Sequence, residues 1–146
     1  MNRSQFFADV PDTRRRLMSK VKSTGSKPEI LVRRSAHRLG FRYRLHVRDL
    51  PGTPDLVFPR LRKVIFVHGC FWHRHANCHR TTMPKARAEY WQKKFDDNVR
   101  RDERSQELLR NLGWEVLVLW ECEAKDTEWL EEHLTAFLSS QSRARR

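Results

Sequence analysis

Two short apolar runs constrain the fold of this chain more than any other feature. KVIFVH at 63–68 and WEVLVLW at 114–120 each have the length of one β-strand, and most of their side chains are apolar. Strands of that composition lie inside a sheet whose two faces are both covered, usually by helices. We therefore expect 63–68 to be a central strand and 114–120 to be buried on both faces.

The segments around these runs predict the remaining elements of an α/β domain. Proline or a capping residue starts each predicted helix, and glycine follows the first two helices as a stop signal. Alternation in FRYRLHV, followed by the turn residues LPGTP, indicates another strand. The predicted order is helix 28–40, strands 41–47, 55–58 and 63–68, helix 84–111, strand 114–120 and helix 126–140. A mixed central sheet flanked by helices is the simplest architecture for this order.

The chain carries a large excess of positive charge. It has 30 Lys and Arg against 18 Asp and Glu in 146 residues, which gives a net charge of +12. Such an excess points to a polyanion, with nucleic acid the leading partner and an anionic membrane surface the alternative. No apolar stretch approaches the roughly 20 residues of a spanning helix, and the charged N-terminus lacks the apolar segment of a signal peptide. We expect a soluble intracellular protein.

Its length suits a single domain, which we place at 27–140. Residues 1–26 are basic and polar and are interpreted as an N-terminal arm; the alternative is a disordered tail. Residues 141–146 are expected to be a basic tail.

The stretch GCFWHRHANC at 69–78 predicts a zinc site. Cysteine and histidine follow one another at metal-ligand spacing here, and the third cysteine of the chain comes just after the apolar run at 114–120. Three thiolates and one imidazole would close a tetrahedral structural site, made of Cys70, His75, Cys78 and Cys122. His73 and His79 compete with His75 as the fourth ligand, and three buried free cysteines are the alternative to a metal.

A second metal site is predicted at PGTPD, where Asp55 precedes an apolar strand. Nucleases commonly hold Mg²⁺ with a carboxylate at the start of one strand and a second ligand on its neighbour, here the strand ending at Val67 and His68. The alternative is that Asp55 only forms the turn.

Aromatic side chains stand in polar surroundings at two places. Phe71 and Trp72 lie in the loop at 69–78, and Trp91 shares a helix face with Lys94 and Asn98. Apolar wedges of this kind kink DNA between base steps, while Lys and Asn hydrogen-bond base edges. The alternative for Trp91 is packing against the sheet.

Four motifs in this order resemble the very-short-patch repair (Vsr) endonucleases of bacteria, over about residues 14 to 135. They are GTPD, VIFVHGCFWHRH, EYWQKKFDDNVRRD and LGWEVLVLWEC. The resemblance implies a restriction-endonuclease-like fold of the PD-(D/E)xK type. It also implies a Mg²⁺-dependent endonuclease that nicks one strand beside a T:G mismatch left by deamination of 5-methylcytosine.

Individual roles are implied by the same resemblance. Asp55 would bind Mg²⁺ through its carboxylate and Val67 through its main-chain carbonyl, and His73 would be the general base for the attacking water. Glu29 and His68 would hold metal-bound waters. The acidic residue and the lysine that give the fold its name are replaced here, so the histidines become more important to the chemistry.

The resemblance also assigns DNA contacts. Phe71, Trp72 and Trp91 would intercalate next to the mismatch, with Lys94 and Asn98 on its edges. Met18 would insert from the other groove, so the arm is expected to become ordered on DNA. The implied zinc ligands are the four residues already named.

The expected protein is a monomer in the bacterial cytoplasm, associated with the nucleoid, with a mismatch-repair protein as a possible partner. Two other functions stay open at this point. One is a restriction-like nuclease of the same fold with another DNA target, and the other is a zinc-stabilised DNA-binding protein without catalysis.

Overall fold

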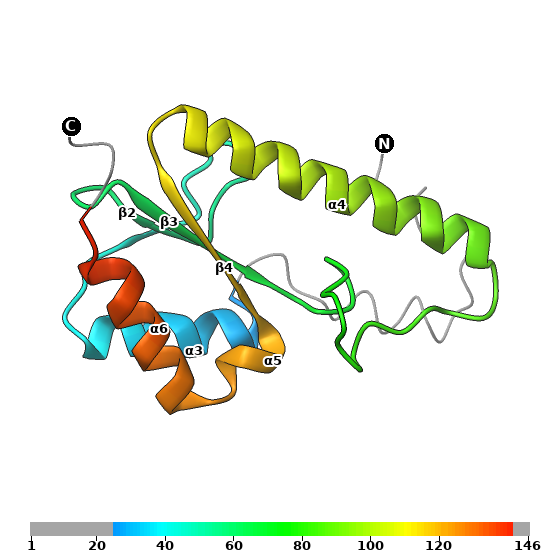
Figure 1. Ribbon diagram of the computed structural model, residues 1–146, viewed down its shortest axis with the longest axis horizontal. Coiled ribbons are helices and arrows are strands. Elements are labelled where there is room, and N and C mark those ends of the chain that lie inside the picture. The colour runs from blue at the N-terminus through cyan, green and yellow to red at the C-terminus, as the bar shows by residue number, and fades with distance from the viewer. Residues whose placement is uncertain (1–24, 142–146) are drawn as a thin grey trace.

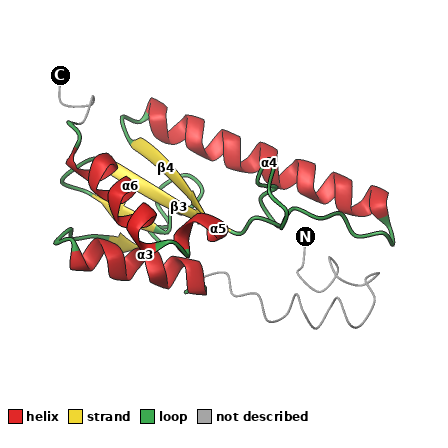
Figure 2. Cartoon of the chain, turned by 60° about the horizontal axis from the view of Figure 1, so that its bottom comes forward, coloured by secondary structure: helices red, strands yellow, loops and turns green. Residues whose placement is uncertain are grey.

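A computed structural model describes residues 25–141 of the chain. The predictions for the arm, including that for Met18, and for the basic tail after residue 141 fall outside the described residues. The predicted mixed sheet flanked by helices is confirmed (Figures 1 and 2).

The sheet has four strands in the order β1-β2-β3-β4. They are β1 (Arg44–Leu45), β2 (Leu56–Phe58), β3 (Lys63–His68) and β4 (Glu115–Trp120). β1 and β2 pair antiparallel, as do β2 and β3, whereas β3 and β4 pair parallel along their whole length. The prediction of a central strand at 63–68 is therefore confirmed.

Helices cover both faces of the sheet. The long helix α4 (Ala88–Asn111) lies on one side, and α3 (Lys27–Arg38), α5 (Glu121–Ala124) and α6 (Thr127–Ser139) lie on the other (Figures 1 and 2). Alternate side chains of the strands divide the core accordingly, because successive residues of a strand point to opposite faces. Leu56 and Ile65 join the cluster under α3 and α6, while Val57 and Val64 join the cluster under α4.

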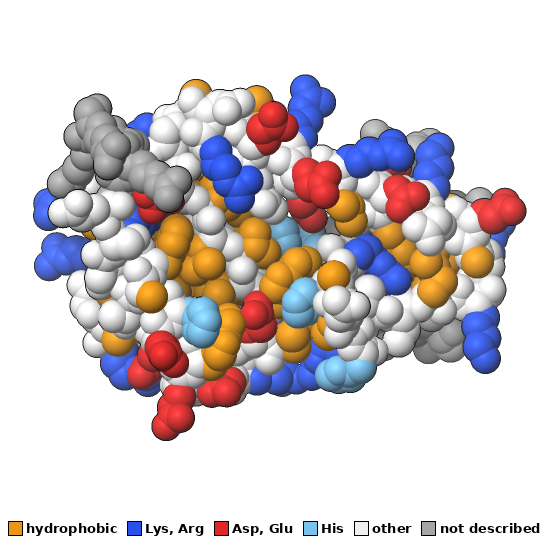
Figure 3. Space-filling view, in the orientation of Figure 1, with side chains coloured by type: hydrophobic (Ala, Val, Ile, Leu, Met, Phe, Trp, Pro, Cys, Tyr) orange, Lys and Arg blue, Asp and Glu red, His pale blue; other side chains and the backbone are white. Residues whose placement is uncertain are grey.

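The prediction that 114–120 is buried on both faces is wrong. β4 is the last strand of the sheet, and within Glu115–Trp120 only Leu119 is fully buried. Apolar side chains gather at the middle of the molecule on the face that looks onto β4, between α4 and α6 (Figure 3). An apolar composition thus identified the strand correctly but not its position at the edge.

Two further boundaries differ from the predictions for local reasons, and one short helix was not predicted. The strand expected at 41–47 shrinks to β1 because His46 takes a left-handed backbone with φ of 49°. The helix expected from Pro84 begins at Ala88, since Arg87 before it has φ of 57°. The four-residue helix α5 was not predicted.

The starts of α3 and α6 show why these helices begin where they do. The Ser26 side chain accepts the Glu29 N–H at 3.4 Å, and the Asp126 side chain accepts the Trp129 N–H at 3.1 Å. Such caps satisfy amide groups that have no partner inside the helix. The cap at Ser26 places Glu29 in the first turn of α3, where it is buried.

Candidate active site

A cavity of about 650 Å³ lies where the start of α3, the loop before β2, the end of β3 and the middle of α4 meet. Its walls bring together residues that are far apart in the sequence. The polar side chains that line it include Glu29, His46, Asp55, His68, His73 and Asp102. Four of these six are the predicted catalytic residues, and Val67, the second predicted Mg²⁺ ligand, also lines the cavity. The structure therefore brings these five predicted residues together in a single cavity.

Asp55 lies immediately before β2, and its carboxylate reaches across to β3. Its Oδ2 accepts the Val67 N–H at 2.7 Å. The pKa of Asp55 is raised to about 7, chiefly by burial; the hydrogen bond from Val67 lowers it, and the nearby carboxylate of Glu29 contributes to the rise. The same burial and the same neighbouring carboxylate favour the binding of a cation here, because a cation would neutralise the negative charge.

Two histidines and an aspartate form a second group in the cavity. The rings of His68 and His73 stack with centroids 3.9 Å apart, and His73 Nδ1 lies 2.6 Å from Asp102 Oδ2. When Nδ1 of His73 carries the proton and donates a hydrogen bond to Asp102, Nε2 has a free lone pair and can act as a base. Burial lowers the pKa of His68 to about 4, so this ring is neutral near pH 7.

Asp102 was not predicted as a functional residue. It lies on α4, 29 positions after His73, within the motif EYWQKKFDDNVRRD. That helix carries several other acidic residues, and nothing in their spacing distinguishes Asp102. Only the packing of α4 beside the loop at 69–78 identifies it.

Glu29 is the most deeply buried acidic group of the cavity, with only 2% of the residue exposed. Its Oε2 accepts the Gly25 N–H at 3.2 Å and also contacts Arg33 and Nε2 of His46, the latter at 3.0 Å. His46 was not predicted either, because it stood inside a segment interpreted as a strand.

The arrangement fits a divalent cation. Glu29, His46 and Asp55 each offer one ligand atom, and these atoms lie within 4.8 Å of one another. Two carboxylates supply the oxygen ligands that Mg²⁺ prefers. The predicted contribution of the Val67 carbonyl stays a prediction; what the structure describes is the Val67 N–H, which orients Asp55.

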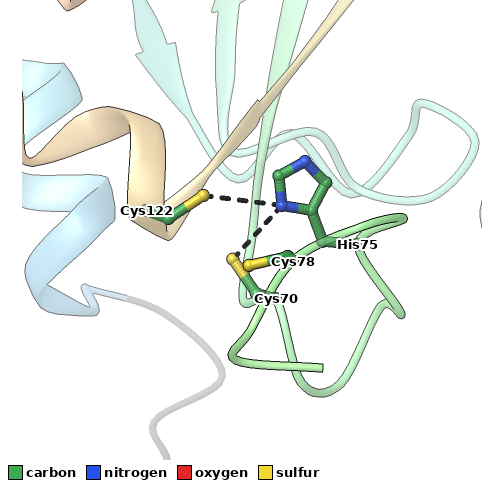
Figure 4. A group of neighbouring side chains, drawn as sticks. All are labelled: Cys70, His75, Cys78 and Cys122. Atoms are coloured by element: carbon green, nitrogen blue, oxygen red, sulfur yellow. Dashed lines mark hydrogen bonds between the residues drawn. The ribbon is translucent and has the colours of Figure 1, made fainter. Parts of the chain in front are cut away.

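The four predicted zinc ligands also come together (Figure 4). Their ligand atoms lie within 4.8 Å of one another, and Nδ1 of His75 is 3.6 Å from Sγ of Cys70 and 3.5 Å from Sγ of Cys122. Of the competing histidines, His73 is bonded to Asp102 and His79 is exposed. Three sulfurs and one imidazole nitrogen form a donor set that could hold a tetrahedral metal ion.

The cysteine cluster joins the loop after β3 to the helix after β4. Burial raises the pKa of the Cys70 thiol to about 12, and the pKa of Cys122 is also raised by burial. These thiols stay protonated unless a cation compensates for the charge of the thiolates. The main chain is held at the same point, because the Cys70 N–H donates to Glu121 Oε1 at 3.0 Å.

The aromatic residues of the loop and of α4 form one cluster. Phe71 and Trp72 are half-buried, line the cavity and contact Trp91, which is only 2% exposed. Phe95 completes the cluster beside Trp91, with ring centroids 5.7 Å apart. Trp91 thus packs against this loop rather than on the sheet, and its insertion into DNA stays a prediction.

Polar contacts support the same loop from α4 and from within. Asn98 donates its side-chain amide to the Trp72 carbonyl at 3.2 Å. The Arg74 guanidinium lies 4.0 Å above the Phe95 ring, and its Nη1 donates to the Thr82 carbonyl at 2.9 Å. Burial lowers the pKa of Lys94. The contacts of Lys94 and Asn98 with DNA stay predictions.

Comparison with known proteins gives this site a context. A family model described as DNA mismatch endonuclease Vsr matches residues 8–80. The type II nicking enzyme V.XorIIP of Xanthomonas oryzae pv. oryzae is 48% identical over 128 residues, which cover 88% of this chain and 93% of that protein. The DNA mismatch endonuclease Vsr of Escherichia coli is 39% identical over 133 residues, covering 88% of this chain and 84% of that protein. The type II nicking enzyme V.NmeAIP of Neisseria meningitidis is 38% identical over 130 residues, covering 88% and 92%.

Within residues 25–141, no helix is both long enough and apolar enough to cross a membrane.

Proposed function

Because this chain belongs to the Vsr family of DNA mismatch endonucleases, and is therefore a DNA-nicking hydrolase, we propose that it nicks one strand of duplex DNA beside a T:G mismatch. Mg²⁺ is the proposed cofactor, and the proposed task is to begin very-short-patch repair of deaminated 5-methylcytosine. The observation that carries the catalytic part is the meeting of Asp55 with the pair His73 and Asp102 in one cavity.

Asp55 is proposed to bind the cation through its carboxylate, together with the Val67 carbonyl, and Glu29 and His68 are proposed to hold waters bound to the ion. When bound, Mg²⁺ would stabilise negative charge on the scissile phosphate and orient the attacking water. The residues fit this role, since Glu29 is buried, Asp55 is half-buried, and their carboxylate oxygens lie within 4.8 Å of each other. Burial raises the pKa of Asp55 because it disfavours the negative charge, and the positive charge of a bound ion would offset that cost.

His73 is proposed as the general base. Its Nε2 takes a proton from water as the water oxygen forms a bond to phosphorus, and the bond from phosphorus to the 3′ oxygen breaks. The 3′ oxygen leaves as a hydroxyl after taking a proton from solvent, and the phosphate stays on the 5′ side. Asp102 keeps the proton of His73 on Nδ1, and the neutral ring of His68 fixes the plane of His73 by stacking.

Recognition of the mismatch is proposed to come from the aromatic cluster and the arm. Phe71 and Trp72 lie at the wall of the cavity, so their insertion would bring the neighbouring phosphate to Asp55. A mismatched step costs less to distort than a paired one, which makes insertion itself selective. A structural zinc ion at the cysteine cluster would hold this loop in place.

We also propose that the protein acts as a monomer on nucleoid DNA in the bacterial cytoplasm and that a mismatch-repair protein cooperates with it. These proposals rest on the family and on the charge of +12. Gel filtration of the free protein and of its DNA complex would test the monomer.

The deciding experiment is a panel of duplexes with Mg²⁺, containing a T:G pair, each other mismatch or only matched pairs. We expect nicking of the T:G duplex alone or far above the rest. Equal nicking of matched duplexes would instead support a nuclease with another DNA target, and binding without nicking would support a non-catalytic DNA-binding protein.

Two variants and two matched controls complete the test. Asp55→Ala and His73→Ala should abolish nicking while DNA binding remains. Asp49→Ala changes an exposed aspartate six residues before Asp55, and His79→Ala changes an exposed histidine six residues after His73, so both variants should nick like the parent. Full activity of Asp55→Ala and His73→Ala would remove the catalytic assignment.

A further inference from the structure

We propose that His46 is a positioning residue that holds the Glu29 carboxylate toward Asp55 and couples α3 to the segment carrying Asp55. This inference rests on the proposed function, because it assigns His46 a role in the same nicking reaction. The observation behind it is a set of contacts that His46 makes in two directions at once, from its ring and from its main chain.

The ring of His46 faces the buried carboxylate. Nε2 lies 3.0 Å from Glu29 Oε2 and 3.1 Å from Arg33 Nη2. Both of those groups belong to α3, whereas His46 follows β1. The histidine is thus a bridge between a helix and a strand that meet at the cavity.

The main chain of His46 faces Asp55. Leu45 pairs with Leu56 as the last pair between β1 and β2, and the His46 N–H then donates to the Asp55 carbonyl at 3.3 Å. His46 therefore contacts the main chain of Asp55 through its N–H and the carboxylate of Glu29 through its ring. A shift of His46 would move the two carboxylates relative to each other.

His46 has an unfavourable backbone conformation in this position. Its φ of 49° lies in the left-handed region, where a side chain with a Cβ atom is strained. Such conformations persist where surrounding contacts determine them, and they cluster at functional sites. Here the strain ends β1 and leaves the ring at the wall of the cavity.

Arg33 explains why Glu29 needs the histidine. Arg33 is four residues further along α3 and pairs with the same oxygen of Glu29. Without the His46 ring, Gly25 and Arg33 remain as partners of this oxygen, and both belong to the chain around the start of α3. We therefore expect the carboxylate to shift toward them and away from Asp55. Nε2 of His46 opposes that movement, since it contacts both members of the pair.

The first test compares His46→Ala with His46→Gln, using nicking of the T:G duplex at saturating Mg²⁺. We expect His46→Ala to lower kcat by about 10–100-fold, the usual cost of removing a group that orients a metal ligand, while KM changes little. His46→Gln should recover most of the loss, because an amide offers a donor for Glu29 and an acceptor for Arg33. His37→Ala, which changes an exposed histidine of α3, is the matched control and should leave kcat unchanged.

The second test asks whether His46 acts through Glu29. If it does, adding His46→Ala to Glu29→Gln should change kcat by no more than about twofold, because coupled residues do not contribute additively. Independent, multiplied losses would overturn the proposal. So would a kcat of His46→Ala close to that of the parent, or a loss that glutamine does not restore and that follows a lowered melting temperature.

Failure of this proposal can be told apart from failure of the proposed function. Asp55→Ala is measured beside the His46 variants with the same duplex. If Asp55→Ala is inactive and His46→Ala is not impaired, the nuclease assignment stands and the role of His46 falls. If Asp55→Ala nicks like the parent, the proposed function itself falls.

Discussion

The burial of Asp55 predicts that replacing it stabilises the metal-free protein. The pKa of this carboxyl rises from 3.8 to about 7 on folding, chiefly because burial disfavours its charge and because Glu29 is near. Asp55→Asn removes the charge but keeps an oxygen that can accept the Val67 N–H. We therefore expect the variant to have lost nicking and gained stability at neutral pH.

How the stability changes with pH depends on whether the folded or the unfolded protein binds the proton of Asp55 more tightly. Below the unfolded pKa, Asp55 is protonated in both states and affects stability little. Between that value and about 7, the unfolded chain releases the proton while the folded protein keeps it, so stability falls as pH rises. Above about 7 the penalty is complete. At about 1.4 kcal/mol per pKa unit, the ceiling is about 4 kcal/mol for a shift of about three units.

The assay is urea unfolding of parent and Asp55→Asn at pH 4 and pH 8, in buffer without Mg²⁺. Chelators are left out, because they would also remove a metal ion bound at the cysteine cluster. We expect the variant to be more stable at pH 8 by about 1–4 kcal/mol, with the difference nearly gone at pH 4. Mg²⁺ should stabilise the parent and not the variant. Asp49→Asn is the exposed control and should change neither value. Equal stability of parent and Asp55→Asn at pH 8 would refute the reasoning.

Three other predictions concern the rest of the site. Metal analysis should find about one zinc ion per chain, and Cys122→Ser should lower both the zinc content and the melting temperature, since four donors close a structural site; an unchanged melt without bound metal would contradict this. Asp102→Asn should lower kcat by about 10–100-fold with little change in DNA affinity, because the amide no longer holds the proton of His73 on Nδ1; wild-type turnover would exclude the pairing from the reaction. Deleting residues 1–20 should weaken DNA binding and flatten its dependence on salt concentration, because fewer phosphate counterions are released; an unaltered salt slope would make the arm a tail.

The sequence predicted those parts of the fold that depend on local patterns. Val64, Ile65 and Phe66 form an apolar run with turns on both sides, and β3 lies at the centre of the sheet as expected. Asp126 caps α6 because a side-chain oxygen at that position satisfies a free amide. Such features need no knowledge of distant neighbours.

Features that depend on distant packing were missed. The composition of β4 resembles that of a central strand, but its place at the edge depends on how many strands the sheet has. Asp102 and His46 are identified only by their contacts with His73, 29 positions away, and with Glu29, 17 positions away. Sequence pattern alone supported the cysteine cluster, weakly Asp55 with the end of the strand at Val67 and His68, and the aromatic side chains as DNA wedges. The catalytic roles of Glu29, His68 and His73 came only from the resemblance to a family.

The parallel pairing of β3 and β4 has a consequence for the timing of folding. The loop carrying His73 begins at the end of β3, but the groups that anchor it, Glu121 and Cys122, follow β4 in the last fifth of the chain. During synthesis His73 therefore leaves the ribosome well before Glu121 and Cys122 do, and the loop cannot take its final form until β4 has joined the sheet. A nascent chain, or one truncated before residue 121, thus lacks the contacts that hold the proposed catalytic loop, so we expect it not to cut DNA.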